Sequence, residues 1–350
     1  MEPQRLTDAT FARRVAIALG VAILLLFLWR IVDALLLAFG AVLVAVLLRA
    51  AAVPLAGRTA LPAWSAIPLV ALLIAAGLVL VVWLVGAEVR DQAADLVRRV
   101  PQAWNALRER LSGTPLGERL TEHMGSVAPD MGGVLARITG VAGSALGVLG
   151  NLVLVVFGGL YFATQPRLYR DGLVKLAPPA AQPSLEGTFD ACGEALRRWL
   201  LGQLLSMTVS AVLTTLGLWL IGVPGYLALG LLAGLAEFVP VVGSILAAVP
   251  GILQALSQGG VELAAWAVLV YLAVQQLQGN VVTPLVTRRM VSLPPALTLF
   301  AIVAFGLVFG PLGVLFAAPL TVVAFVAVKK LWVREALGEE TDVPGEDGAA

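Results

Sequence analysis

Charged residues are scarce in this sequence. Only 13% of its 350 residues are Asp, Glu, Lys or Arg, whereas 59% are hydrophobic, and the mean hydropathy is +0.94. A water-soluble domain carries about 25% charged and about 45–50% apolar residues. The composition therefore excludes an ordinary soluble protein, and the formal net charge of +1 leaves no bulk basic surface for nucleic acid.

Cysteine and histidine are almost missing as well. The one cysteine, Cys192, cannot form an intramolecular disulfide, and the one histidine, His123, cannot supply the clustered ligands of a metal site. With a single histidine far from any carboxylate in the apolar runs, no Ser/His/Asp or Cys/His set can be assembled, and no Walker-type phosphate loop is present. The sequence predicts neither an enzyme nor a metal- or cofactor-dependent protein.

Long apolar runs make up most of the chain. Each comes close to the stretch of about 20 residues that crosses a hydrocarbon core about 30 Å thick. We therefore expect an all-α, polytopic integral membrane protein with about eight transmembrane helices in contact with the lipid bilayer. The first run follows Arg13 and Arg14 as a signal peptide would, but without a small-residue cleavage site, so we expect a retained helix. The runs lie at about 15–29, 34–48, 64–87, 141–163, 203–222, 261–279, 295–309 and 311–328.

Three parts of the chain are more polar. Apolar residues recur at helical spacing among charges in 88–140, which predicts an amphipathic segment outside the hydrocarbon. Between the fourth and fifth apolar runs, a linker helix is expected to lead into the fifth run. The acidic tail has too few apolar residues to fold, so we expect the tail to be disordered. The predicted division is 1–87 for the first three transmembrane helices, 88–140 for the amphipathic segment, 141–200 for the fourth transmembrane helix and the linker helix, 201–334 for a C-terminal transport core, and 335–350 for the tail.

The apolar segment 226–257 is interrupted at Pro240 and Gly243. The interruption leaves two arms of about 14 residues, each about 21 Å long at 1.5 Å per residue, which is too short for a comfortable crossing. We interpret the segment as a re-entrant helical hairpin, although two short full crossings would have the same parity. With this hairpin, the Lys and Arg residues of the short loops fall on one side, which predicts a bacterial-type inner (plasma) membrane protein with both termini in the cytoplasm and 88–140 outside it.

The interruption is also the first candidate for a functional site. Broken backbone at membrane depth is tolerated only where it is buried or lines a wet cavity, and such breaks mark transport sites. Glu237 stands beside the break, and an ionisable residue in apolar surroundings is a functional candidate, whereas the alternative is an interfacial carboxylate that reaches water. We expect Glu237, Pro240 and Gly243 to line a path for a solute or ion.

A second candidate lies at the end of a later apolar run. Tyr271, Gln275, Gln278 and Asn280 precede Pro284 there. Amide side chains both donate and accept hydrogen bonds, so they suit a polar ligand or the backbone groups that a proline leaves free. Helix capping and contacts between helices are the alternative. Gly230 with Gly234, and Gly306 with Gly310, are spaced by four residues and predict close helix packing.

The motifs of the C-terminal half, taken in their order along the chain, are similar to those of the autoinducer-2 exporter family, formerly an uncharacterised family of permeases. The specific motifs lie between about 222 and 320, and the N-terminal half matches by layout alone. The resemblance adds Gly313 and Pro319 to the expected packing or hinge positions. It rests on Gly222-Val-Pro224, Gly230, Gly234, Glu237, Pro240-Val-Val-Gly243, Pro250, Tyr271, Gln275 through Asn280 to Pro284, Leu293-Pro294, Gly310-Pro-Leu-Gly313 and Ala318-Pro319.

The resemblance implies a homo-oligomeric inner-membrane transporter that exports a quorum-sensing signal of the autoinducer-2 type, or that exchanges Na⁺ or Li⁺ for protons. Many relatives resemble Gln-x-x-Glu-x-Asn where this chain has an amide at Gln278. The missing carboxylate moves any role as a carrier of protons or monovalent cations to Glu237. Export of a small polar solute is the first hypothesis, antiport is the alternative, and a third is a non-transporting membrane scaffold whose segment 88–140 binds a partner.

Overall fold

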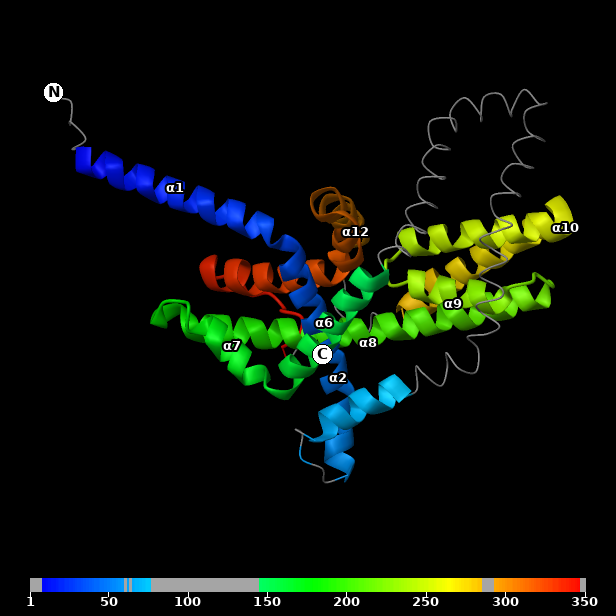
Figure 1. Cartoon of the computed structure of the whole chain (residues 1–350), viewed down its shortest axis with the longest axis horizontal. Coiled ribbons are helices and arrows are strands. Elements are labelled where there is room, and N and C mark those ends of the chain that lie inside the picture. Colours follow the sequence, from blue (N-terminus) through cyan, green and yellow to red (C-terminus); the bar gives the residue numbers. More distant parts are fainter. Residues whose placement is uncertain (1–7, 60–61, 63–64, 77–144, 285–292, 347–350) are drawn as a thin grey trace.

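The computed structural model describes residues 8–59, 62, 65–76, 145–284 and 293–346, which Figure 1 colours along the sequence. Within these ranges every regular element is a helix, and the predicted all-α class is confirmed. The amphipathic segment expected at 88–140 and its histidine, His123, lie outside the described residues.

Small residues bring the N-terminal helices together. α1 (Asp8–Arg30) and α2 (Val32–Thr59) are separated by one turn residue, and α2 packs against α6 (Ala145–Thr164). A Cβ at Gly159 would lie 2.6 Å from the side chain of Val44, so the glycine sets the distance between these helices. The helix Ser65–Ala76 completes this cluster.

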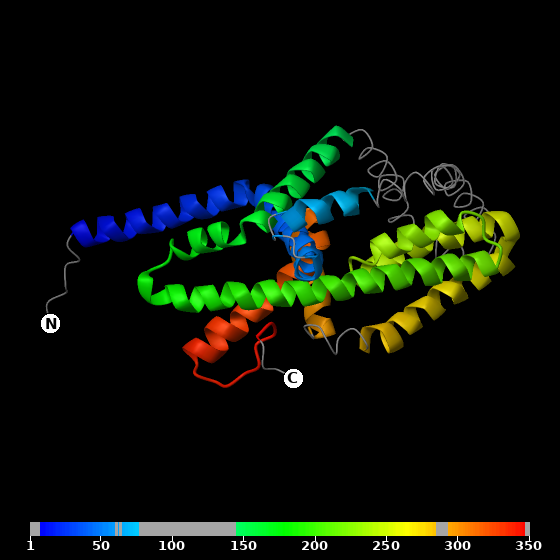
Figure 2. The same cartoon turned by 90° about the horizontal axis from the view of Figure 1, so that it is seen from below.

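A single long helix connects the two halves of the described structure. α7 (Pro166–Val174) leads into α8 (Gln182–Leu220), which has 39 residues and is about 58 Å long at 1.5 Å per residue. Figures 1 and 2 show α8 reaching from the end that holds α7 to the end that holds α9 and α10. The expected linker helix and the apolar run at 203–222 are therefore parts of one continuous helix.

The next elements are broken twice. α9 (Tyr226–Ala236) is followed by α10 (Val242–Leu277) and the π-helical turn η2 (Gln278–Val282). The backbone breaks between α9 and α10, where the sequence predicted it, and again inside α10 at Gly259 and Gly260. Gly260 has φ 67° and ψ −158°, a conformation that is essentially limited to glycine. α10 therefore has two arms, and its second arm matches the apolar run expected at 261–279.

The last long helix is also bent. α12 (Pro295–Ala327) continues into η3 (Val328–Ala336), and Gly310 interrupts it with φ 63° and ψ −147°. A Cβ at Gly313 would collide with the carbonyl oxygen of Phe305, so a glycine is required for the two arms to fold together. The apolar runs at 295–309 and 311–328 are the two arms of this one bent helix.

α8 takes part in two separate apolar cores. Its N-terminal half contributes Ala195, Leu196 and Trp199 to a cluster with α2 and α12. Its C-terminal half places Leu218 in a second cluster with α9 and both arms of α10, including Ala255. The bent elements α9 and α10 are thus held on α8 by a core of their own.

The surface is strongly apolar outside these cores. Leu26 on α1, Leu220 on α8 and Leu307 on α12 are 69%, 74% and 84% exposed, and such side chains are tolerated in lipid rather than in water. The polytopic membrane class is confirmed, whereas the count of about eight crossings stays a prediction. Among the described residues, the helices with the length and composition to cross a membrane are Val32–Gly57, Pro179–Leu220, Val242–Val282 and Pro295–Ala336, and the shorter apolar helices are Ser65–Ala76, Gly150–Thr164 and Tyr226–Ala236.

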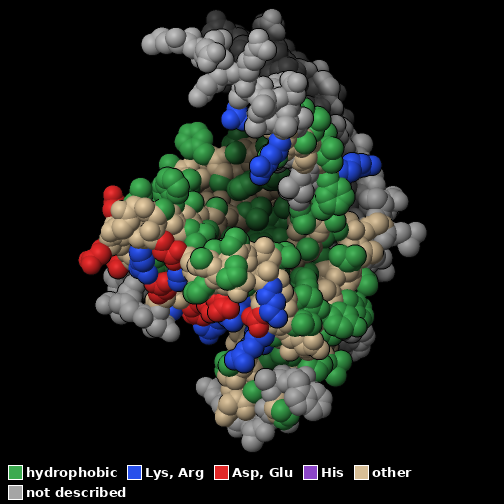
Figure 3. Space-filling model, turned by 90° about the vertical axis from the view of Figure 1, so that its left-hand side faces the viewer, with side chains coloured by type: hydrophobic (Ala, Val, Ile, Leu, Met, Phe, Trp, Pro, Cys, Tyr) green, Lys and Arg blue, Asp and Glu red, His purple; other side chains and the backbone are tan. Residues whose placement is uncertain are grey.

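The structure describes the acidic tail through Glu346, and this part is packed on the protein, so the predicted disorder of 335–350 is wrong for residues 335–346. η3 ends at Ala336, and Val343 is only 1% exposed in the cluster with Ala191 and Ala195 of α8. Figure 3 shows charged side chains gathered in one band on this face of the molecule, where hydrophobic side chains cover much of the remaining described surface. A low apolar content did not prevent folding, because the tail packs on a core that other segments build.

Candidate functional site

A pocket of about 310 Å³ lies where α8 meets α9 and both arms of α10. Most of its wall is apolar, and five polar side chains interrupt that wall. Ser210 and Thr214 come from α8, and the others come from α10. The lining residues are Ser210, Thr214, Ala233, Val241, Ser244, Ile245, Ala248, Ile252, Val268, Tyr271, Leu272, Val274 and Gln275. Two broken elements and one continuous helix therefore form a half-open concave site, whose lining includes the exposed side chains of Ile245 and Leu272.

Two polar atoms of this wall are buried without a hydrogen-bond partner in the described part of the chain. They are the Oγ1 of Thr214 and the Oη of Tyr271, and a third such atom is the Oε1 of Gln254. A buried hydroxyl without a partner costs about 1–3 kcal/mol, so it favours any ligand that supplies a donor or an acceptor. Thr214 on α8 and Tyr271 on α10 therefore give the pocket hydrogen-bonding groups that no protein group satisfies in the described part of the chain.

Glu237 lies behind the same wall. Its side chain is 8% exposed, and its Oε2 accepts a hydrogen bond from the Oγ of Ser210 at 3.4 Å. Its backbone carbonyl oxygen accepts a hydrogen bond from the Nε2 of Gln203 at 2.6 Å. Among the described residues no Lys or Arg forms an ion pair with it. The sequence-predicted carboxylate thus contacts the pocket through Ser210 without lining it.

The backbone at the break is held in a rare conformation. The N–H of Val242 donates to the carbonyl oxygen of Pro240 at 2.8 Å, which closes a γ-turn around Val241. Val241 has φ 68° and ψ −58°, and it is the one non-glycine residue with positive φ among those described. This form of γ-turn is strained, at a cost on the order of 1–3 kcal/mol for a β-branched residue. The strain sits on a residue that lines the pocket.

Gly243 permits the tight entry into α10. A Cβ at this position would collide with the carbonyl oxygen of Ala236 at the end of α9. Pro240 and Gly243 therefore shape the break, and neither residue lines the pocket.

The second predicted group is divided between three places. Gln275 lines the pocket. Gln278 is 4% exposed and donates from its Nε2 to the carbonyl oxygen of Ser206 on α8 at 2.8 Å. Asn280 and Pro284 are exposed and do not line the pocket. Gln278 therefore fixes η2 to α8, and only Gln275 and Tyr271 of this group reach the candidate site.

The predicted glycine positions lie at close approaches. A Cβ at Gly230 would collide with Thr215, and one at Gly234 would lie 2.6 Å from the Cβ of Ala211, so α9 rests directly on α8. Gly306, Gly310 and Gly313 lie instead at the bend of α12, whose second arm carries the buried Pro319, and none of these residues lines the pocket.

Sequence reasoning missed the polar stripe of α8. Gln203, Ser210 and Thr214 are all buried, and their spacing of seven and then four residues puts them on one face of the helix. The signal was present, because small polar residues recur at helical spacing inside the apolar run at 203–222. Ser and Thr are common in membrane helices, however, and the stripe gains meaning only from the break that faces it.

The polar groups of the pocket wall are hydroxyls and one amide, which can bind a small ligand through hydrogen bonds. Among the described residues, no three His, Cys, Asp or Glu side chains cluster to hold a metal ion. The pocket offers apolar contact together with hydroxyl and amide groups from Ser210, Thr214, Tyr271 and Gln275. This combination suits a small molecule that carries hydroxyl or carbonyl groups on an otherwise compact body.

Comparison with known proteins identifies relatives of this chain. The sequence is 30% identical over 134 residues to YrrI of Bacillus subtilis, which is provisionally named a transport protein, and the match covers 38% of this chain and 36% of YrrI. It is 26% identical over 256 residues to PerM of Escherichia coli, provisionally named a permease, over 72% of this chain and 69% of PerM. It is 32% identical over 101 residues to the AI-2 transport protein TqsA of Escherichia coli, over 29% of each chain.

The matched region is only part of several of these relatives, since it spans 36% of YrrI and 59% of YueF, another Bacillus subtilis protein provisionally named a transport protein. The family model covers far more of this chain. The model described as AI-2E family transporter matches residues 15–332, which include the bent helices α10 and α12 and the whole pocket. The chain belongs to the AI-2E transporter family.

Proposed function

We propose that this protein is a secondary transporter that moves a small, neutral, hydroxylated solute through the pocket between α8, α9 and α10. The observation that carries the proposal is the pair of buried hydroxyls, Thr214 Oγ1 and Tyr271 Oη, which lack partners and line the pocket from two elements. A solute hydroxyl could satisfy both, and the apolar wall would hold its carbon skeleton.

The position of the pocket supports transport rather than storage or anchoring. Irregular backbone in a membrane protein is tolerated where it is enclosed by protein or lines a cavity, and the break at Pro240 to Val242 borders this one. Transporters commonly bind substrate at such discontinuous helices. The relative TqsA is named an AI-2 transport protein, and a compact hydroxylated molecule of that type fits the chemistry of the pocket wall.

The cellular setting belongs to the same proposal. Lys and Arg residues on one side of the predicted spans support an inner-membrane location with both termini in the cytoplasm. We propose a homo-oligomer, in keeping with the family resemblance.

The decisive experiment removes the two hydroxyls. Thr214→Val and Tyr271→Phe keep shape and delete one oxygen each, so we expect either variant to slow AI-2 uptake into everted membrane vesicles about 10-fold or more, because a hydrogen bond of about 1.5 kcal/mol is lost. Thr208→Val and Tyr161→Phe are matched controls on exposed positions and should transport at the wild-type rate. Wild-type rates in both pocket variants would refute the proposed site.

A second candidate, exchange of Na⁺ or Li⁺ for protons, is favoured by one observation. Glu237 is a buried carboxylate with no ion-pair partner among the described residues, and its hydrogen bond links it to the pocket wall at Ser210. In proteoliposomes, Glu237→Gln should abolish pH-dependent cation flux if the carboxylate carries the proton or cation. Cation flux that persists in this variant excludes Glu237 as the carrier.

A non-transporting scaffold predicts a closed interior. In a Cys192→Ala background, cysteines placed at Glu237 and Gln275 should react with small aqueous thiol reagents if the pocket belongs to a transport path. Failure to react from either side of the membrane would support the scaffold.

A further inference from the structure

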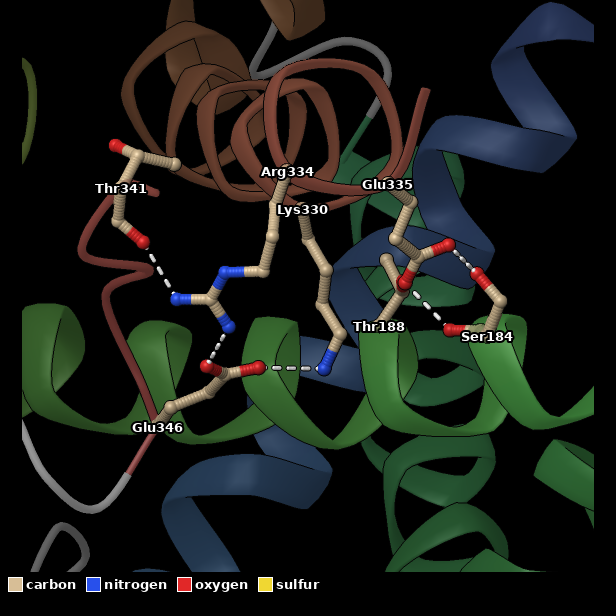
Figure 4. A network of polar contacts seen from close by, with 7 residues as sticks. All are labelled: Ser184, Thr188, Lys330, Arg334, Glu335, Thr341 and Glu346. Atoms are coloured by element: carbon tan, nitrogen blue, oxygen red, sulfur yellow. Dashed lines mark hydrogen bonds and ion pairs between the residues drawn. The ribbon is translucent and has the colours of Figure 1, made fainter. Parts of the chain in front are cut away.

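The C-terminal segment Leu337–Glu346, which we call the strap, folds back along η3. All three cations of η3 reach it, as Figure 4 shows for two of them. The Nζ of Lys330 binds the carboxylate of Glu346 at 2.6 Å, and Arg334 binds the same carboxylate. Arg334 also donates to the carbonyl oxygen of Thr341 at 2.5 Å, and Lys329 donates to that of Asp342 at 3.0 Å.

The strap crosses from η3 to α8 at a single apolar anchor. Val343 is the strap residue that is buried, and it packs in the core cluster with Ala191, Cys192 and Ala195 of α8. Gly345 follows with φ 96°, and a Cβ there would collide with the carbonyl oxygen of Ala191. The strap therefore lies directly against the backbone of α8 while the cations of η3 hold its other side.

The strap packs beside the contact between α8 and α12. The Sγ of Cys192 donates to the carbonyl oxygen of Val323 on α12 at 3.8 Å, and Cys192 shares its cluster with Val343. Ser184 at the start of α8 binds Glu335 of η3 beside the strap (Figure 4). The end of α12 is thus joined to α8 partly through the strap.

The attachment consists of ion pairs and of hydrogen bonds from cations to backbone carbonyl oxygens, and it is only partly exposed, since the side chain of Lys330 is 13% exposed. The side chains of Glu346 and Arg334 are 31% and 38% exposed, and one valine supplies the buried apolar contact. Salt shortens the range of such charge interactions from about 10 Å at 0.1 M to about 3 Å at 1 M. Ionic strength should therefore act on the strap far more than on the apolar helix packing beneath it.

We propose that Leu337–Glu346 is an ionic-strength-sensitive strap that clamps the end of α12 against α8 at low salt and releases it at high salt. Positive-φ glycines at both ends, Gly338 and Gly345, allow the segment to turn away from η3 and α8. Release frees the end of α12 to move relative to α8. For its effect on transport, this inference rests on the proposed function.

The native thiol reports strap release without any substrate. Cys192 is the single cysteine and is buried where α8 contacts α12, so the full-length protein in liposomes can be labelled with a maleimide across a KCl series. We expect the labelling rate to rise at least about 5-fold between about 0.1 M and 1 M KCl. Glu346→Gln removes the carboxylate that binds both cations and should label fast at low salt, with little further dependence on KCl.

A matched control removes a charge of the same segment that forms no ion pair with any residue the structure describes. Glu340 is exposed, so Glu340→Gln should label as slowly as the wild type at low salt. If Glu346→Gln labels as slowly as Glu340→Gln, the strap is not held by its ion pairs and the proposal is wrong. A size-exclusion profile that matches the wild type shows that faster labelling does not come from unfolding.

Flux separates the regulatory step from the proposed function. In AI-2 vesicle assays, Glu346→Gln at low salt should transport at the rate that the wild type reaches at high salt. Fast labelling with an unchanged flux would overturn the regulatory role. Absence of AI-2 flux in the wild type would instead contradict the proposed substrate and leave the labelling result as the test of the strap.

Discussion

The bend at Gly310 allows a sharp test of the fold, because one chemical change is expected to have opposite effects at two sites. Gly310 has φ 63° and ψ −147°, whereas Gly193 lies within the helical α8. A Cβ added at either glycine would meet no atom within 4 Å. Replacement by alanine therefore changes the backbone preference and causes no collision.

The two magnitudes follow from backbone energetics. Alanine in the conformation of Gly310 costs on the order of 1–3 kcal/mol, and the smaller freedom of the unfolded chain returns about 0.4–1 kcal/mol. Gly310→Ala should therefore destabilise the protein by about 1–2 kcal/mol. Gly193→Ala should stabilise it by up to about 1 kcal/mol, because alanine is the better helix former.

Thermal unfolding in detergent, followed by tryptophan fluorescence, measures both changes. We expect Gly310→Ala to lower the Tm and Gly193→Ala to raise it. Shifts of the same sign would refute the reasoning, and a higher Tm for Gly310→Ala would mean that α12 is a straight helix at this position.

Two further predictions concern the tail and the contact between α8 and α9. Hydrogen bonds from Lys330 and Arg334 hold the pKa of the Glu346 carboxyl below its ordinary value. The contribution of this carboxylate to stability is therefore complete above the ordinary pKa and is lost as the pH falls through the lowered pKa. Thermal unfolding across this acidic range should show the loss in the wild type and not in Glu346→Gln. Gly234→Val should push α9 away from Ala211 and cost about 1–3 kcal/mol by overpacking, which a lower Tm together with weaker solute flux would show.

The sequence located the breaks because their causes are local. Pro240 and Gly243 interrupt an apolar run, and the structure has its γ-turn and its tight entry into α10 at these residues. Gly259 and Gly260 separate the two arms of α10 for the same reason, since few other residues adopt such backbone angles. The positions of helix ends could therefore be read along the chain.

The composition of the candidate site was predicted only in part. Glu237, Tyr271 and Gln275 were expected at the path, and the structure brings all three to the pocket or its wall. Ser210 and Thr214 were missed because a small hydroxyl on an apolar helix is usually a packing residue. Their role depends on which face of α8 meets α10, and spacing along one helix does not specify its partner.

The sequence by itself determined that this protein belongs in a membrane, through its scarcity of charge and its long apolar runs. Exposure of so much apolar surface to water is unfavourable whatever fold the chain adopts. The tertiary structure alone decided which polar atoms stay without a partner and whether the acidic tail is ordered. Both depend on groups that are distant in sequence: Thr214 and Tyr271 line one pocket from different helices, and Glu346 finds Lys330 and Arg334 only when the tail returns to η3.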